Sequence, residues 1–257
     1  MRKIYLAWWT GMGGKNWGDA LSPVLTKYIS GGAQIEHVNP IDSSSKFRFY
    51  SIGSIIPPSS SNSEIWGSGI IQNIDTIKIK PKKVHAVRGP LTRKILINNG
   101  IECPEIYGDP ALLYPKFYNP KIEKRYEIGI IPHYVDQQNP WVVKKSELPN
   151  VKVINILGNI NSVVDEILSC DMIISSSLHG VIAADAYGIP SAWVEFSDKV
   201  VGNGFKFKDY FMSVGRPDRQ PIRINPHTRL KDIKDVVKQH EIKIDLNKLW
   251  DACPFKK

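Results

Sequence analysis

Cysteine is scarce in this sequence: Cys103, Cys170 and Cys253 are the only three among 257 residues, and no two of them form a CxxC pair. This argues against a disulfide framework and against a cysteine zinc site, and it predicts a reducing, cytoplasmic environment. An HxxxH pair and carboxylates clustered at metal-ligand spacing are also missing. We therefore predict no metal site.

Long apolar runs are missing as well. No run approaches the roughly 20 residues that cross a bilayer, so any membrane association is expected to be peripheral. Residues 1–9 have too short an apolar core for a signal peptide, and glycines with Lys15 follow in place of a cleavage site. We expect the first strand there, followed by a glycine-rich loop that matches neither the P-loop nor the dinucleotide-binding spacing.

Positive charge is in excess, with a net charge of +9. This favours an anionic partner, such as nucleic acid, an anionic membrane surface or a phosphorylated small molecule. The basic residues are scattered apart from a cluster at residues 78–83. That cluster is most simply a solvated loop, so no nucleic-acid partner is expected.

Residues 170–194 carry the pattern of a βαβ unit. An apolar run over residues 172–174 predicts a buried strand, three serines end it, and helical spacing begins at His179 and stops at Gly188. His179 is thereby placed where the carboxyl end of a strand meets the amino end of a helix. Anions bind at such positions because helix N–H groups are unpaired there, so His179 could act on an anionic ligand.

A strand, a polar turn and a helix start recur at Asp19, Arg88, Asp109 and His179. Asp19 is expected to cap its helix, with Pro23 in the first turn, and prolines follow the turns at Arg88 and Asp109 as first helical residues. In a parallel sheet such turns share one edge, so these side chains can converge on one crevice, although each alone could be simple capping. The expected strands are residues 4–9, 49–52, 64–66, 84–87, 105–107, 127–131, 151–157, 172–174 and 189–194.

The whole pattern predicts an α/β protein of two halves that face each other across a cleft. A boundary is expected within residues 114–125, where prolines interrupt the pattern and charges accumulate. We therefore predict one domain over residues 1–120 and a second over residues 121–257. No internal repeat is visible, and helical spacing returns near Val236 and near Leu249.

Five motifs in this order resemble the polysaccharide pyruvyl transferase family, and the resemblance covers nearly all of the chain. They are N-W-G-D-A-L over residues 16–21, W-G-S-G over 66–69, V-R-G-P-L-T over 87–92, G-D-P-A-L-L over 108–113 and S-L-H-G over 177–180. The resemblance implies two Rossmann-like domains, as in GT-B glycosyltransferases, with the acceptor on the first domain and the donor on the second.

The resemblance also implies an activity. Family members transfer pyruvate from phosphoenolpyruvate, a co-substrate, to two hydroxyls of a sugar in a cell-surface glycan, forming a ketal and releasing phosphate without a cofactor. The implied acceptor is a polysaccharide of an exopolysaccharide or capsule, or its repeat unit on a polyprenyl diphosphate. Basic side chains could then hold the protein at the inner face of the plasma membrane.

One position departs from the family pattern. Members often carry Arg-Leu-His-Gly at the last motif, where the Arg and His are linked to phosphoenolpyruvate, but here Ser177 stands in place of that Arg. Another cation should substitute. Arg88 is the first candidate, and Lys206 and Arg223 are the others.

His179 is the predicted acid and base, since its ordinary pKa suits proton transfer in either direction, and a bound anion should keep it protonated. Arg88 suits bidentate binding of a carboxylate or phosphate, and Asp19 could orient or deprotonate an acceptor hydroxyl. The residues assigned to catalysis are His179, Asp19 and Arg88. The residues assigned to substrate binding are Asn16, Ser177, Leu178, His133, Gly67, Asp109, Lys206 and Arg223. Trp8, Trp9, Trp17 and Trp66 could stack on sugars or fill the core.

Two other functions fit the same residues. A glycosyltransferase that uses a nucleotide sugar would have the same fold, and fold does not decide function. A non-catalytic relative that binds glycans or lipid phosphates would explain the change at Ser177 as lost catalysis.

Overall fold

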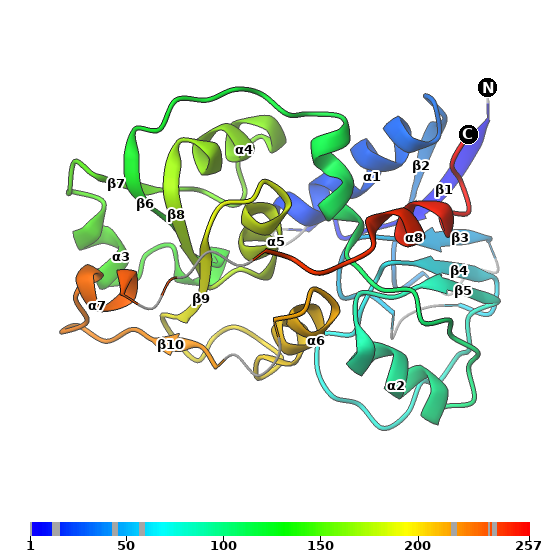
Figure 1. Ribbon diagram of the computed structural model, residues 1–257. Helices are drawn as coiled ribbons and strands as arrows, with labels where there is room; N and C mark the ends of the chain where they lie inside the picture. Colours follow the sequence, from blue (N-terminus) through cyan, green and yellow to red (C-terminus); the bar gives the residue numbers. More distant parts are fainter. Residues whose placement is uncertain are drawn as a thin grey trace.

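The structure is a computed structural model that describes residues 2–11, 16–42, 46–56, 60–216, 220–235, 237 and 241–257. Its strands form two separate five-stranded sheets in which every pairing is parallel (Figure 1). The first sheet has the order β2-β1-β3-β4-β5 and the second β10-β9-β8-β6-β7. The prediction of an α/β protein with two Rossmann-like halves is confirmed.

The strands of the first sheet are β1 (Lys3–Ala7), β2 (Gln34–Val38), β3 (Arg48–Tyr50), β4 (Ser63–Trp66) and β5 (Lys83–Ala86). Those of the second are β6 (Tyr126–Ile131), β7 (Val151–Val153), β8 (Cys170–Ser175), β9 (Ser191–Glu195) and β10 (Ile222–Arg223). Numbered from its own first strand, each sheet has the order 2-1-3-4-5. The strand order therefore reverses between β1 and β3 and again between β6 and β8, which are the topological switch points where open α/β sheets bind ligands.

The central strands are apolar because helices and loops cover both of their faces. Ile128, Ile130 and Ile131 of β6 are buried, as are Ile173 and Ile174 of β8. Runs of this kind are typical of parallel sheets. The edge strands β2 and β10 lack such runs and are partly exposed, which is why the apolar pattern did not predict them.

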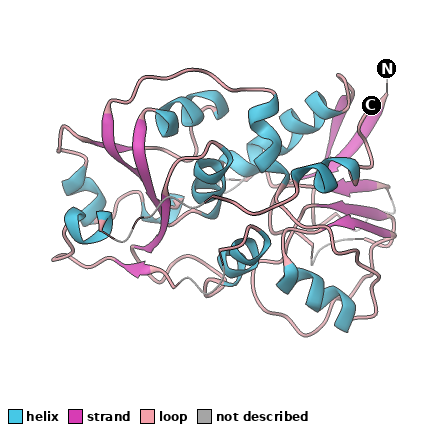
Figure 2. Ribbon diagram, in the orientation of Figure 1, coloured by secondary structure: helices cyan, strands magenta, loops and turns pink. Residues whose placement is uncertain are grey.

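The helices are α1 (Trp17–Ile29), α2 (Pro90–Asn98), α3 (Pro140–Lys145), α4 (Ile160–Leu168), α5 (Leu178–Ala186), α6 (Phe205–Ser213), α7 (Leu230–Lys234) and α8 (Leu246–Asp251), with 3₁₀ turns η2 (Pro110–Lys116) and η3 (Tyr134–Asp136). Figure 2 shows the strands gathered in two groups with helices between them. Prolines open α2 and η2 as predicted.

Three local predictions are wrong. Asn16, not Asp19, is the N-cap of α1, because the Asn16 carboxamide oxygen accepts the Gly18 N–H while Asp19 lies within the first turn. Pro23 lies inside that helix rather than in its first turn. Residues 105–107 form an isolated bridge between Tyr107 and Val87 instead of a strand. The predictions for Met12–Lys15 and for Val236 lie outside the described residues.

The two halves share one core. The Trp17 indole N–H donates to the Ile160 carbonyl at 3.1 Å. At the other end, α8 returns to the first sheet, where the Trp66 indole N–H donates to the Leu249 carbonyl at 2.8 Å. Phe255 packs edge-on against Trp66, and both ends of the chain lie side by side (Figure 1). Residues 246–255, within the range predicted as the second domain, thus contact the first sheet.

None of the helices in the described part of the chain is both long and apolar enough to cross a membrane. Cys103, Cys170 and Cys253 are all buried and free.

Candidate active site

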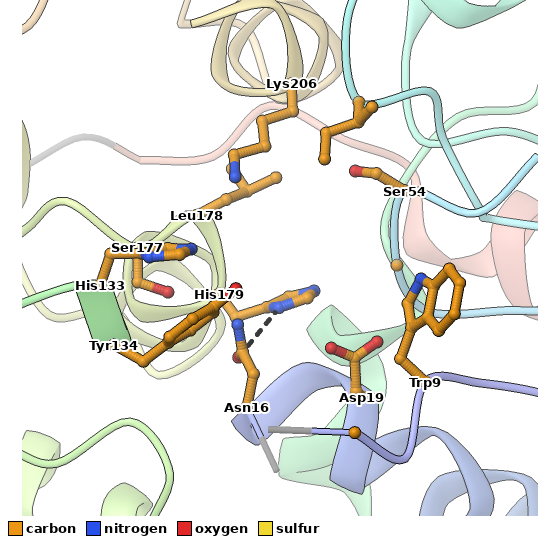
Figure 3. A pocket seen from close by; sticks show the side chains of 13 residues that line it. Trp9, Asn16, Asp19, Ser54, His133, Tyr134, Ser177, Leu178, His179 and Lys206 are labelled. Carbon is orange, nitrogen blue, oxygen red and sulfur yellow. Dashed lines mark hydrogen bonds between the residues drawn. The ribbon is translucent and has the colours of Figure 1, made fainter. Parts of the chain in front are cut away.

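A cavity of about 290 Å³ is lined by segments from both switch points (Figure 3). Because each of these segments follows the carboxyl end of a strand, side chains distant in sequence meet there. From the first half come Trp9, Gly11, Asn16, Asp19, Gly53 and Ser54. From the second half come His133, Tyr134, Ser177, Leu178, His179 and Lys206.

His179 lies in the first turn of α5, with its side chain only 9% exposed. Its Nδ1 is 3.3 Å from the side-chain oxygen of Asn16, and its Nε2 is 4.0 Å from Oδ2 of Asp109. The ring packs on the backbone of Gly18, where a Cβ atom would lie 2.3 Å from three ring atoms. The glycine of the N-W-G-D motif is therefore needed to seat the imidazole.

The electrostatic surroundings of His179 disfavour a positive charge. Burial is the main cause, and with the nearby charges of Lys206, Arg88 and His133 it lowers the pKa of His179 to about 3. The imidazole is therefore neutral at neutral pH in the free protein. The expectation that a bound anion protonates it stays a prediction.

Two carboxyl groups of the site hold protons unusually well. Burial, with a smaller contribution from Asp109, raises the pKa of Asp19 to about 7, although Lys206 opposes this. Burial raises the pKa of Asp109 to about 6 against the effects of the Ala111 N–H and Arg88. Both groups can therefore donate or accept a proton near neutral pH. Asp109 also caps η2 through Oδ1, which accepts the Ala111 N–H at 3.0 Å.

Lys206 points from α6 into the cavity (Figure 3). Within the described part of the chain its ammonium group has neither an ion pair nor a hydrogen bond, and it lies 5.8 Å from the centre of the Phe207 ring. Burial and Arg88 lower the pKa of Lys206 to about 8, so the group remains mostly charged at pH 7. Burial and Lys206 lower the pKa of His133 to about 4, which leaves His133 neutral.

Ser177 presents a polar atom without a partner. It is the N-cap residue of α5, but its hydroxyl makes no capping bond. That hydroxyl is buried against the cavity and lacks a hydrogen-bond partner among the described residues. Leu178 and Asn16 line the cavity beside it. The site thus combines an unpaired hydroxyl, an unpaired ammonium group and the amino end of a helix, which together suit an anion.

Four of the predicted residues lie outside the cavity lining, and one of them, Asp109, is the buried neighbour of His179 described above. Arg88 is 1% exposed and held by Asp209, Ser54 and the Ile70 carbonyl, so its guanidinium acts on the site as a buried neighbouring charge. Gly67 has a φ of +82°, and a Cβ there would lie 2.4 Å from Pro110, so its place is structural. Arg223 lies on the edge strand β10, largely exposed and paired with Glu195.

The tryptophans divide between the cavity and the core. Trp9 lines the cavity and is 38% exposed, whereas Trp17 and Trp66 are fully buried and hydrogen-bonded to backbone carbonyls. Trp8 packs edge-on against His37. Stacking on a sugar therefore remains a prediction for Trp9 alone among these four.

Several residues of the site region were not predicted as site residues: the cavity lining includes Gly11, Gly53, Ser54, Ile71 and Tyr134, and Asp209 binds Arg88. Ser54 lines the cavity and follows β3, so the shared sheet edge was a signal that could have found it. Tyr134 lies next to His133, and its ring is 37% exposed. Asp209 is buried within an aromatic helix and binds Arg88 from 121 positions away, for which the sequence carries no local signal.

Comparison with known proteins completes the description. The model of the family described as polysaccharide pyruvyl transferase matches residues 27–198. Protein L143 of Acanthamoeba polyphaga mimivirus is 36% identical over 174 residues, which are 65% of this chain and 60% of that protein. The succinoglycan biosynthesis protein ExoV of Rhizobium meliloti is 27% identical over 183 residues, 68% of this chain and 55% of that protein. The matched region thus covers less than two thirds of either relative.

Proposed function

We propose that this chain, which belongs to the polysaccharide pyruvyl transferase family, transfers pyruvate from phosphoenolpyruvate to two hydroxyls of a sugar and releases phosphate. The observation that carries the proposal is the convergence of Lys206, Ser177 and His179 on one small cavity at the switch points of both sheets. Such a cavity suits a small polyanion, and phosphoenolpyruvate brings both a phosphate and a carboxylate.

Three groups of the cavity are our candidates for binding the anion. Lys206 supplies an ammonium charge that has no partner among the described side chains, and the Ser177 hydroxyl supplies a buried donor. The third is the amino end of α5, whose first residues Leu178 and His179 line the same cavity, because the first N–H groups of a helix can bind an anion. Lys206 is therefore our candidate for the cation that substitutes at Ser177, since Arg88 is bound by Asp209.

The reaction needs a proton on the methylene carbon, which leaves an oxocarbenium-like centre at the neighbouring carbon. One sugar hydroxyl adds to that centre and loses its proton; the second then replaces phosphate and also loses its proton. We assign the donation of this proton to His179, because a bound polyanion opposes the repulsion that Lys206 and Arg88 exert on a charged imidazole.

Asp19 is the candidate base for the sugar hydroxyls. Its carboxyl lines the cavity, and its pKa of about 7 makes the base form available at neutral and higher pH. Trp9 and Tyr134 are exposed in part on the lining and can contact the acceptor. We propose further that the acceptor is a repeat unit on a polyprenyl diphosphate and that the excess positive charge favours an anionic membrane surface.

The test is a mass-spectrometric transfer assay with phosphoenolpyruvate and a panel of galactosides, glucosides and N-acetylmannosaminides. His179→Gln should lower the rate by about 10²–10⁴-fold, the usual range for a lost acid or base. His227→Gln, an exposed histidine far along the chain, should leave the rate unchanged.

The same samples separate the two alternative functions. Thermal stabilisation by a nucleotide diphosphate but not by phosphoenolpyruvate would indicate a nucleotide-sugar glycosyltransferase and contradict our proposal. Stabilisation by phosphoenolpyruvate without product from any acceptor, including a lipid-linked one, would indicate a non-catalytic relative.

A further inference from the structure

The imidazole of His179 has a hydrogen-bond acceptor on both sides. On one side Nδ1 is 3.3 Å from Oδ1 of Asn16. That same oxygen accepts the backbone N–H of Gly18 at 3.3 Å, which fixes the orientation of the Asn16 side-chain amide. Nδ1 must therefore be the donor, and a neutral ring carries its lone pair on Nε2.

On the other side Nε2 and Oδ2 of Asp109 face each other at 4.0 Å. Both atoms are buried, and neither has a hydrogen-bond partner among the residues that the structure describes. The second carboxyl oxygen of Asp109 is already occupied by the Ala111 N–H. The gap exceeds hydrogen-bond length by about 1 Å, and such bonds often close only when a ligand is bound.

We propose that Asp109 and His179 share one proton: while Asp109 of the empty site is protonated, the proton lies on its Oδ2, and it moves to Nε2 of His179 when an anion occupies the cavity. In this step the O–H bond of Asp109 breaks and an N–H bond of His179 forms, with no proton from solvent. Asp109 is a positioning residue, since it acts through His179. Its part in pyruvyl transfer rests on the function proposed above.

The location of the pair explains the direction of the transfer. An empty buried site favours two neutral groups over an ion pair, because burying separated charges is costly. His179 lines the cavity whereas Asp109 is fully buried outside the lining, so a bound anion lies nearer to the imidazole. An anion therefore stabilises positive charge on the ring more than it destabilises negative charge on the carboxyl.

The other charged and titratable groups around the pair come from several elements. Lys206 of α6, Arg88 after β5 and His133 before η3 disfavour a charged imidazole. Asp19 of α1 and Tyr210 of α6 lie close enough for Asp109 to raise the pKa of each. The attraction of the bound anion for a charged imidazole must outweigh the combined effect of Lys206, Arg88 and His133, which lower the pKa of His179. The proton transfer needs no change in the protonation of Asp19 or Tyr210.

Nuclear magnetic resonance of ¹⁵N-histidine-labelled protein tests the proposal, with His179→Gln to assign the ring signals. Asp109→Asn keeps an oxygen for the Ala111 N–H but cannot release a proton, and Asp251→Asn, at an exposed aspartate, is the matched control. The experiment is run at about pH 5, below the pKa of Asp109, so that this carboxyl is protonated in the empty site. In wild-type and control protein, phosphoenolpyruvate should then convert the ring from the neutral Nδ1–H form to imidazolium. In Asp109→Asn the ring should stay neutral while calorimetry still detects binding.

Imidazolium in the ligand-bound Asp109→Asn variant, or a neutral ring in the ligand-bound wild type, would overturn the proposal. Failure of phosphoenolpyruvate to bind would instead refute the proposed function. In that case a pH titration of the free protein tests whether Asp109 and His179 share a proton. There the Nε2 signal should shift as Asp109 loses its proton near pH 6, and this shift should vanish in Asp109→Asn. An identical titration in both proteins would refute proton sharing.

Kinetics supply a further readout if the enzyme is active. Asp109→Asn should lower kcat by about 10²-fold or more while the KM for phosphoenolpyruvate changes little. An unchanged kcat in Asp109→Asn would refute the positioning role and leave Asp109 only as the cap of η2.

Discussion

Two buried groups of charged side chains lie where the halves of the molecule meet, and they differ in how fully they are paired. In the first, Arg88 binds Asp209, Ser54 and the Ile70 carbonyl, and Asp209 also accepts the N–H and hydroxyl of Thr92. In the second, around His179, both Nε2 and the facing oxygen of Asp109 are buried without a hydrogen-bond partner in the part of the chain that the structure describes, as is the Ser177 hydroxyl. The groups are similarly buried, so burial does not distinguish them.

The difference indicates different roles. Buried polar atoms are nearly always hydrogen-bonded, and a saturated group such as Arg88 and Asp209 holds two segments in register. Unpaired atoms cost stability, and natural proteins keep them mainly where a ligand or reacting group supplies the missing partner. The Arg88 group therefore joins the halves, whereas the unpaired atoms of the His179 group support our proposal that a ligand binds there.

Removing one member of the paired group should have the largest effect. Asp209→Ala leaves Arg88 charged and buried without its carboxylate, which should lower the free energy of unfolding by about 3–5 kcal/mol. Urea denaturation measures this, with the exposed Asp251→Ala as the control. A change equal to that of the control would contradict the structural role of the pair.

Replacing Asp19, which lines the cavity beside the unpaired group, should instead raise the free energy of unfolding at high pH. Its pKa is raised from 3.8 to about 7 in the folded protein, so folding favours the protonated form. The resulting stability is present below about pH 4 and is lost as the pH rises through 7. Relative to wild type, Asp19→Asn should therefore gain on the order of 4 kcal/mol between pH 4 and pH 8. Urea denaturation at both pH values checks this, and a constant difference would refute it.

Lys206→Met should separate binding from folding. It keeps the length and apolar stem of the side chain but removes the unpaired ammonium group. A lost charge-assisted hydrogen bond should weaken phosphoenolpyruvate binding by about 10–100-fold in calorimetry. The pKa of His133 and of His179 should rise toward the ordinary value, since Lys206 lowers both. Unchanged affinity together with unchanged histidine titration would place the ammonium group outside the site. Lys208→Met, on the same helix, is the matched control.

Ser177→Ala should have the smallest effect. Removing a buried hydroxyl without a partner should raise the free energy of unfolding by about 1 kcal/mol and weaken phosphoenolpyruvate binding a few-fold. Thermal unfolding with and without the ligand measures both quantities. A destabilised variant would show that this hydroxyl is satisfied in the free protein.

The sequence predicts the parts of the fold that follow from local pattern. Buried strands, prolines at helix starts and the turns at Asp19, Arg88, Asp109 and His179 are all readable, and they place the site at one sheet edge. The edge strand β2 was not predicted, because only Val38 among its five residues is buried and the strand therefore lacks an apolar run. The sequence alone suggests that Arg88 binds a ligand, whereas the structure pairs it with Asp209. That partner is 121 positions away in the chain. Long-range pairing of this kind cannot be read from one sequence.

The return of α8 to the first sheet has a consequence for synthesis of the chain. Trp66 and Leu249, which form a buried hydrogen bond, are 183 positions apart. At the usual rate of translation, about 10–40 s pass between the appearance of the tryptophan and that of its partner. Once β5 has also been made, the first sheet has all five strands but not the segment that covers Trp66. The half that is made first on the ribosome is therefore among the last to complete its core.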